Sequence, residues 1–93
     1  MIKAFKDGRT RSIWELRLIK GVPADIAKTA LRKLRYIDAA VSLDDLRIPP
    51  ANRLEALKGD RRGQYSIRVN DQFRICFVWK DGDAYHVELV DYH

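Results

Sequence analysis

Residues Leu54–His93 read LEALKGDRRGQYSIRVNDQFRICFVWKDGDAYHVELVDYH, and this stretch decides the fold. Apolar and polar residues alternate through three runs, at residues 65–69, 73–79 and 85–89. Alternation is the period of a half-buried β-strand, and turns that contain Asn and Asp separate the runs. Residues 54–56 alternate briefly as well. The pattern predicts an antiparallel meander of four to five strands with one apolar face.

The register of the first predicted hairpin follows from which side chains must share a face. A two-residue Asn70–Asp71 turn would place Ile67 opposite Arg74 and mix apolar with charged residues. A three-residue loop over 70–72 instead places Ile67 opposite Ile75. Because a slip of one residue turns every side chain to the other face, we expect the three-residue loop.

In the second predicted hairpin, the local turn signal conflicts with the assignment of faces. The dipeptide Asp81–Gly82 favours a two-residue turn, but that turn would pair Phe77 with His86. A three-residue loop over 81–83 keeps the apolar residues on one face, so we expect the longer loop. The cross-strand pairs that it predicts are Trp79–Tyr85, Phe77–Val87 and Ile75–Leu89.

The first half of the chain predicts the cover for this sheet. Met1–Phe5 alternates and predicts a short edge strand. We expect a first helix with its N-cap at Thr10, an apolar side that includes Leu18, and a stop at Lys20–Gly21. Pro23 then suits the first turn of a second helix, where its missing N–H is no loss.

The second predicted helix has one apolar stripe and a basic opposite side. Its apolar residues recur at three- and four-residue spacing and are Ile26, Ala30, Leu34, Ile37 and Val41. Lys28, Arg32 and Arg35 line the other side, either as a solvated face or as a contact for a partner or a phosphate. Together the patterns predict a single α+β domain over residues 1–93, a two-layer structure with both helices on one face of the antiparallel sheet.

The composition narrows the class of protein. The 93 residues carry 18 Lys and Arg against 13 acids, a net charge of +5, which favours nucleic acid or an acidic protein as partner. No apolar run approaches the roughly 20 residues of a membrane span, and the first residues lack the apolar core of a signal peptide. The one cysteine, Cys76, cannot form an internal disulfide. We therefore expect a cytoplasmic protein without membrane contact.

The second face of the predicted sheet carries most of the ionisable residues. Its polar members are Glu55, Ser66, Arg68, Arg74, Cys76, His86, Glu88 and Tyr92. The register places Arg68 opposite Arg74, where the two cations repel each other. A bridging anion such as a phosphate would relieve this repulsion, and so would neutralisation by Glu55 and Glu88.

Missing motifs exclude several chemistries. Two histidines and one cysteine do not make a metal-ligand set, and no glycine-rich phosphate loop or serine-nucleophile motif is present, so we expect no metal and no cofactor. General acid–base catalysis on an anionic substrate remains. Cleavage of RNA through its own 2′-OH fits, because it needs only a base, a cation beside the phosphorane and an acid for the departing 5′-oxygen.

Four segments form a specific combination: RLEALKGD at Arg53–Asp60, GQYSIRVN at Gly63–Asn70, FRICF at Phe73–Phe77 and VDYH at 90–93. In this combination the sequence resembles the HigB-type toxins of the RelE/ParE superfamily, also described as plasmid maintenance system killer or host-inhibition toxins. The resemblance implies a RelE-like fold and an endoribonuclease, an mRNA interferase that cuts mRNA in the ribosomal A site, beside the 16S rRNA, and inhibits translation. It also implies a cognate helix-turn-helix antitoxin of the HigA type, through which alone the toxin would meet operator DNA.

The resemblance also implies roles for individual residues. The catalytic residues that it implies, besides Glu55, are Lys58, Arg74, Asp91, Tyr92 and His93. The residues expected to hold the RNA backbone by their charge are Arg61, Arg62 and Arg68. Within the catalytic set, Lys58 and Arg74 would contact and stabilise the scissile phosphate.

Glu55 departs from the HigB pattern, in which a histidine stands at this place. A glutamate here is similar to the YoeB-type relatives, in which a Glu acts as the base. We therefore hypothesise that Glu55 is the general base, that Arg74 stabilises the phosphorane and that His93 is the general acid. Tyr92 would stack on the nucleotide or orient it.

Two other functions are consistent with the sequence. A non-catalytic inhibitor similar to the ParE branch would act on DNA gyrase, and a basic binding module would carry a degenerate site. The presence of Glu55, Arg74, Tyr92 and His93 as an acid–base set favours the ribonuclease.

Overall fold

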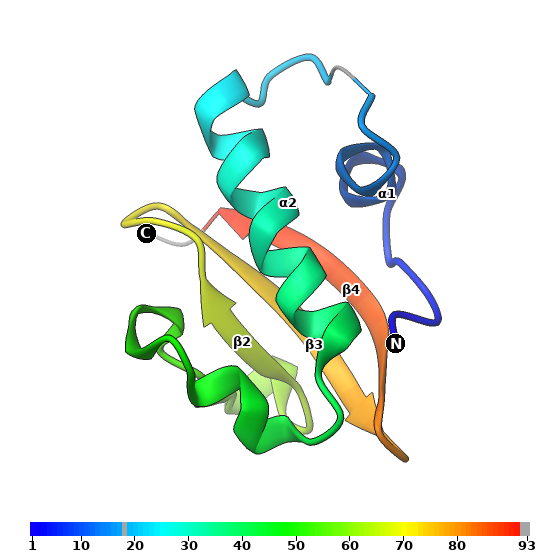
Figure 1. Cartoon of the computed structure of the whole chain (residues 1–93), viewed down its shortest axis with the longest axis vertical. Helices are drawn as coiled ribbons and strands as arrows, with labels where there is room; N and C mark the ends of the chain where they lie inside the picture. The colour runs from blue at the N-terminus through cyan, green and yellow to red at the C-terminus, as the bar shows by residue number, and fades with distance from the viewer. Residues whose placement is uncertain (18, 92–93) are drawn as a thin grey trace.

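The computed structural model describes residues 1–17 and 19–91, and within them the chain forms one sheet with its two α-helices on one side. The helices are α1 (Gly8–Trp14), α2 (Ala24–Ala39) and three short 3-10 helices, η1 (Leu43–Arg47), η2 (Pro50–Asn52) and η3 (Gly59–Arg61). The strands are β1 (Glu55–Ala56), β2 (Tyr65–Arg68), β3 (Phe73–Lys80) and β4 (Asp83–Asp91), antiparallel and in the order β1-β2-β3-β4. Figure 1 shows α2 lying across the sheet. The predicted two-layer α+β meander is confirmed.

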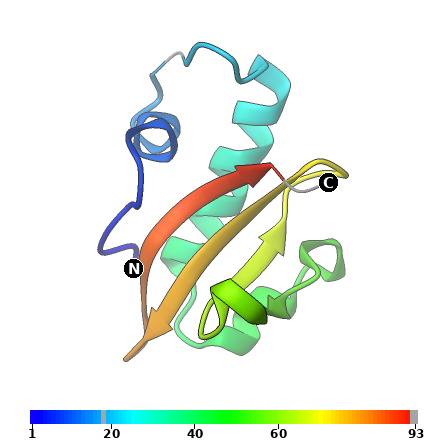
Figure 2. The same ribbon diagram turned by 180° about the vertical axis from the view of Figure 1, so that it is seen from behind.

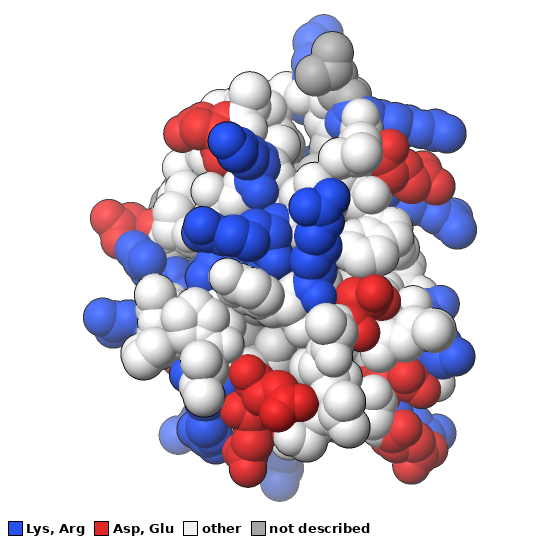
Figure 3. Space-filling view, in the orientation of Figure 1, with Lys and Arg blue, Asp and Glu red and all other residues white. Residues whose placement is uncertain are grey.

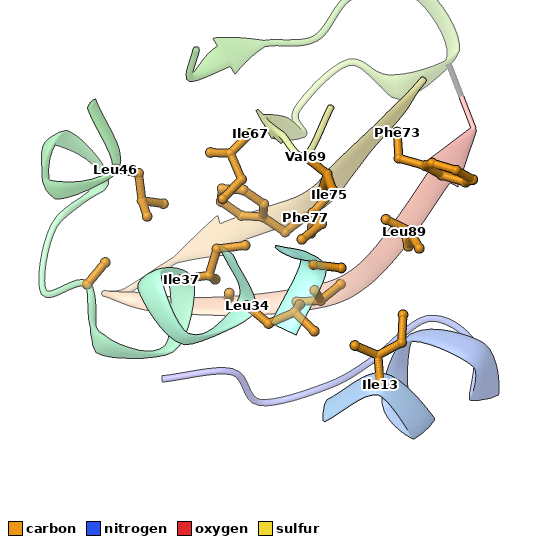
Figure 4. Close-up of a cluster of buried hydrophobic side chains, with 14 residues drawn as sticks. Ile13, Leu34, Ile37, Leu46, Ile67, Val69, Phe73, Ile75, Phe77 and Leu89 are labelled. Carbon is orange, nitrogen blue, oxygen red and sulfur yellow. The ribbon is translucent and has the colours of Figure 1, made fainter. Parts of the chain in front are cut away.

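The core lies where the apolar side of the sheet meets the helices. Ile67, Ile75 and Phe77 are fully buried, and Leu34 and Ile37 of α2 pack against them (Figure 4). Burying each side chain of this kind stabilises the fold by about 1.5–3 kcal/mol. The alternation in the sequence therefore identified the correct face of the sheet.

The apolar stripe of α2 follows the prediction as far as the helix itself. Ala30, Leu34 and Ile37 are fully buried. Val41 is 82% exposed, which corrects the prediction, because the backbone becomes extended at Ala40 and leaves the helical path. The amphipathic helix α2 is the longest helix among the described residues. No helix among these residues is long and apolar enough to cross a membrane.

The first helix is shorter and begins earlier than the sequence predicts. Asp7 is its N-cap in place of Thr10, and the Asp7 Oδ1 accepts a hydrogen bond of 2.8 Å from the Thr10 N–H. The helix ends at Trp14, so the prediction that it continues to Lys20 is wrong. Leu18, expected on its apolar side, lies outside the described residues.

The N-terminal segment, predicted as a short edge strand, forms no strand, but it pairs with the outer edge of β4 through isolated bridges. Ile2 and Phe5 form parallel bridges to Ala84 and Val87. Backbone hydrogen bonds of 2.8 to 3.1 Å join the two segments. This pairing covers the edge of β4, which would otherwise present unpaired backbone groups.

The hairpin between β2 and β3 has the predicted register. Ile67 pairs with Ile75 and Tyr65 with Phe77. The Val69 N–H donates to the carbonyl oxygen of Phe73 at 3.0 Å and closes the loop.

The hairpin between β3 and β4 corrects the prediction of a three-residue loop. Lys80 pairs with Asp83, so the turn is the two-residue Asp81–Gly82 turn. Asp81 has φ 53° and Gly82 has φ 82°, as a turn with two left-handed residues requires. Trp79 consequently pairs with Ala84, and the predicted pair of Trp79 with Tyr85 does not form.

A β-bulge in β4 keeps its apolar residues on the core face, although the two-residue turn alone would turn them to the other face. The register shifts between the pairs Val78–Tyr85 and Cys76–Glu88, where His86 has φ 52°. The extra residue returns β4 to the expected alternation, and Ile75 pairs with Leu89 as predicted. The chain thus satisfies both the local turn preference and the apolar face.

The face of the sheet away from α2 is also partly covered. Ser66 and Cys76 are fully buried and Arg74 is 9% exposed, whereas the sequence predicts helices on the other face and no cover for this one. The cover is the connector between α2 and β2, drawn in green, which lies over part of this face in Figure 2. Apart from residues 54–56, this connector lacks the apolar periodicity of a helix or strand, so the sequence pattern does not reveal its position.

The bulge makes a specific prediction about His86. His86→Val should lower the free energy of unfolding by about 1–2 kcal/mol, because a β-branched residue is strained at positive φ. His86→Gly should cost much less, and urea unfolding measures both. Lys80→Val, at an exposed position on the same hairpin with ordinary φ, controls for surface hydrophobicity. Equal stability of the two His86 variants would contradict the bulge.

Candidate active site

Arg74 lies at the centre of the candidate site. β3 directs its side chain to the face away from α2, opposite Arg68 of β2 and Val90 of β4. Its Nε donates to the Ser66 Oγ at 2.8 Å, and its Nη2 donates to the Arg53 carbonyl oxygen at 2.7 Å. Hydrogen bonds from a charged, nearly buried group contribute about 1.5–3 kcal/mol each. The guanidinium is therefore held in one orientation.

The guanidinium of Arg74 keeps one edge available to a ligand. Its Nη1 makes no hydrogen bond to the described residues. Arg74 is 9% exposed, so solvent reaches part of this side chain. An anchored cation with a free edge suits the binding of a phosphate oxygen.

Glu55 places a carboxylate beside this cation. β1 pairs Glu55 with Ser66, and the Glu55 Oε1 lies 3.9 Å from the Arg74 Nη2. This distance exceeds the roughly 2.7–3.2 Å of a hydrogen bond, so the two groups are neighbours without being bonded. The Glu55 side chain is 57% exposed and can accept a proton from a ligand.

The loop that carries the predicted phosphate and RNA contacts is tied to β4 by an ion pair. The Arg61 Nη1 lies 2.7 Å from the Glu88 Oε1 and 3.2 Å from the Gln64 Oε1. The Lys6 Nζ also approaches the Glu88 Oε1, at 3.8 Å. Arg61, predicted as an RNA contact, therefore has a structural partner, whereas Lys58 at the start of η3 is exposed.

The predicted repulsion between two arginines is relieved within the protein. Arg68 forms an ion pair with Asp71, and Arg74 is bound by Ser66 and the Arg53 carbonyl. Neither therefore requires a bridging anion to be stable. Of the three residues predicted to hold RNA backbone, Arg62 is exposed and makes no ion pair with the described residues.

The described chain reaches the start of the predicted C-terminal triplet. Asp91 pairs with Phe73 and is two residues from Leu89, so in the alternation of β4 it belongs with the core-facing residues. The Gln72 Nε2 donates to the Asp91 Oδ2 at 3.1 Å. Tyr92 and His93 lie outside the described residues. Val90 lies opposite Arg74, so β4 brings Asp91, the first residue of the triplet, to the strand end near that arginine.

Two residues that support the site were not assigned a role from the sequence. Ser66 holds the Arg74 guanidinium, and alternation already placed both on one face. The Arg53 carbonyl is aimed at Arg74 by a left-handed backbone, φ 45° and ψ 58°, for which the side-chain pattern holds no signal.

Cys76 lies next to the site, but its thiol is unreactive. It is fully buried between Ser66 and Glu88 in the register of the sheet. Burial raises the pKa of the Cys76 thiol, and nearby Arg61 lowers it by less. The thiol therefore stays protonated and is a poor nucleophile.

A known family and known proteins match most of the chain in sequence. A family model described as HigB-like toxin, a RelE-like toxin of the type II toxin–antitoxin system HigB, matches residues 3–93. Toxin HigB-1 of Vibrio cholerae serotype O1 is 48% identical over 68 residues, which cover 73% of this chain and 72% of that protein. Endoribonuclease HigB of Proteus vulgaris is 38% identical over 93 residues and all of both chains.

Solved structures share the fold at low sequence identity. The YoeB–YefM complex from Staphylococcus aureus matches with a TM-score of 0.64 and 17% identity, over 100% of this chain and 98% of that one. YafQ from E. coli matches with a TM-score of 0.56 and 13% identity, over 98% and 93% of the two chains. These likenesses bear on the fold alone.

The ion pair between Arg61 and Glu88 should contribute measurably to stability. Glu88→Gln should lower the free energy of unfolding by about 1–2 kcal/mol, because the Glu88 side chain is only 13% exposed and the cations around it lose their partner. Urea unfolding measures the loss. Asp44→Asn breaks the exposed pair with Arg47 and should cost less than about 0.5 kcal/mol.

A charge exchange tests whether the pair itself carries this effect. Arg61→Glu combined with Glu88→Arg should be more stable than the sum of the single variants predicts. Additive losses would mean that Glu88 acts through other contacts.

Proposed function

Because the chain belongs to the HigB-like family of RelE-like toxins from type II toxin–antitoxin systems, we propose that it is an endoribonuclease that cuts mRNA in the ribosomal A site. The relative from Proteus vulgaris, aligned over the full length of both chains, is named an endoribonuclease. One observation carries the proposal for this chain. An exposed carboxylate, Glu55, lies 3.9 Å from an anchored guanidinium, Arg74, that keeps a free edge.

The proposed reaction uses the 2′-OH of the RNA as its nucleophile. Glu55 takes the proton of the 2′-OH, and the oxygen attacks the neighbouring phosphorus in line with the departing 5′-oxygen. Arg74, oriented by Ser66 before the substrate arrives, stabilises the charge that develops on the phosphorane. The products are a 2′,3′-cyclic phosphate and a 5′-OH.

The remaining roles follow from the resemblance. His93 protonates the departing 5′-oxygen, Tyr92 orients the nucleotide, and Asp91 completes the site. Lys58, exposed on the connector, contacts the scissile phosphate. Metal ions and cofactors have no role in this proposal.

The proposed surroundings of the reaction are the ribosome and an antitoxin. The RNA contacts proposed for its backbone, Arg61, Arg62 and Arg68, use charge alone, as binding to the mRNA and the 16S rRNA requires. A cognate helix-turn-helix antitoxin of the HigA type silences the toxin and provides its connection to operator DNA. The site of action is the cytoplasm.

Replacing Glu55 tests the proposed base. Glu55→Gln keeps the size of the side chain but cannot take a proton, so cleavage of translated mRNA should fall by about 10²- to 10⁴-fold. Primer extension on a message translated in the presence of each purified variant measures this. Asp44→Asn, which changes an exposed acid that pairs with Arg47 and has no role in the proposed reaction, serves as the matched control and should cut like the wild type.

Each outcome separates the proposed function from its alternatives. Unchanged cleavage by the Glu55→Gln variant would mean that Glu55 is not the base. Intact message with damaged DNA, from wild-type protein, would favour an inhibitor of the ParE kind. Intact message and intact DNA would favour a basic binding module.

A further inference from the structure

A row of basic side chains follows the exposed face of α2. Lys28, Arg32 and Arg35 are spaced four and three residues apart, so they are neighbours on one side of the helix. None of the three forms a salt bridge with a described residue. Figure 3 shows basic side chains gathered over α2. Like charges at these spacings destabilise a helix by about 0.2–0.5 kcal/mol per pair, a cost that an anionic partner would remove.

An apolar hollow lies beside this row, between α1 and α2. Its volume is about 260 Å³, and its lining includes Ile13, Leu16, Ala27 and Leu31, with Lys28 at its border with the basic row. Apolar side chains therefore form most of this concave surface among the described residues. A hollow of this kind favours a ligand with apolar side chains.

Leu16 gives this hollow an unusual wall. The residue has φ 62°, a left-handed conformation that costs an L-residue about 1–2 kcal/mol, and it is 73% exposed. Its backbone N–H donates to the Ile13 carbonyl oxygen at 3.1 Å and fixes this conformation at the end of α1. A strained backbone that presents a large apolar side chain to solvent is a feature of binding sites.

The apolar hollow and the basic row form one continuous surface. A second hollow, of about 400 Å³, is lined by Lys28, Thr29, Leu31, Arg32 and Arg35. Lys28 and Leu31 line both hollows. We call the combined surface the α1–α2 groove.

We propose that the α1–α2 groove binds an amphipathic helix of a partner protein, with apolar side chains on one side and Asp or Glu on the flank. The apolar side would fill the hollow at Leu16 and Leu31, and the acids would pair with Lys28, Arg32 and Arg35. Helices recognised in grooves use anchors at this three- and four-residue spacing. RNA could pair with the basic row, but its phosphates gain nothing from an exposed leucine.

The groove is separate from the candidate active site. α2 covers one face of the sheet, whereas Arg74 and Glu55 lie on the other. A helix in the groove therefore leaves the base and the guanidinium uncovered. The antitoxin proposed above would be one source of such a helix, but the inference itself does not rest on the proposed function.

Peptide binding to the full chain tests this inference. The probe is a synthetic helix of about 18 residues with Leu at positions i, i+3, i+4 and i+7 and Glu beside them, labelled for fluorescence anisotropy. It should bind at least roughly tenfold more tightly than a scrambled peptide of the same composition. Leu16→Asn, which tolerates the left-handed backbone, and the double variant Arg32→Glu/Arg35→Glu should each weaken binding roughly tenfold.

Controls distinguish a specific groove from general attraction of anions. Val41→Asn removes an equally exposed apolar residue outside the groove and should leave peptide binding unchanged. Leu16→Asn should also leave mRNA cleavage unchanged, which separates this test from that of the nuclease. Equal binding of the patterned and scrambled peptides would overturn the inference. The inference would also fail if a short single-stranded RNA displaced the peptide and Leu16→Asn changed neither the binding of the peptide nor the binding of the RNA.

Discussion

The buried guanidinium of Arg74 is the interaction on which the candidate site depends. A cation that is only 9% exposed is costly unless its hydrogen bonds are satisfied, and its partners come from two separate parts of the chain. Ser66 belongs to the sheet, whereas the Arg53 carbonyl belongs to the connector that crosses the sheet. Arg74 therefore holds the connector in place through the Arg53 carbonyl, and the same hydrogen bond fixes the orientation of the Arg74 guanidinium. Glu55 follows Arg53 by two residues, so this tie also determines where the carboxylate lies.

A second polar contact holds the connector at the preceding residue, Asn52. The Lys33 Nζ of α2 donates to the Asn52 Oδ1 at 2.6 Å, and the Asn52 amide donates to the Leu46 carbonyl oxygen at 3.2 Å. Burial lowers the pKa of Lys33, and the nearby Arg32 and Arg68 lower it further. Asn52 and Arg53 are adjacent, so consecutive residues bind to α2 and to β3. The connector is thus positioned by hydrogen bonds as well as by its apolar contacts.

The sequence predicted those features that depend on apolar periodicity and missed those that depend on polar contacts. Alternation gave the register of β2 and β3 correctly, because only one register keeps Ile67 and Ile75 on the same face. It failed at the β3–β4 turn, since a bulge at His86 allows the short turn and the apolar face to coexist. The burial of Cys76 could not be predicted, because its cover has no period. For the site, resemblance supplied Glu55 and Arg74, which the structure places side by side, but the carbonyl that aligns Arg74 has no signature in side-chain pattern.

The pairing of the N-terminal segment with β4 has a consequence for the order in which the chain can fold. The Leu89 N–H donates to the Thr10 Oγ1 at 2.8 Å, and the Arg9 Nη2 donates to the Leu89 carbonyl oxygen at 2.6 Å, so the first residues bind some of the last. Contacts over such sequence separations form late, after the costly closure of a long loop. β4 is the last of the described strands to be synthesised, so a nascent chain that has not yet reached it leaves the N-terminal segment and α1 without these partners. The native packing of the first residues is therefore completed only after every other described element has been made.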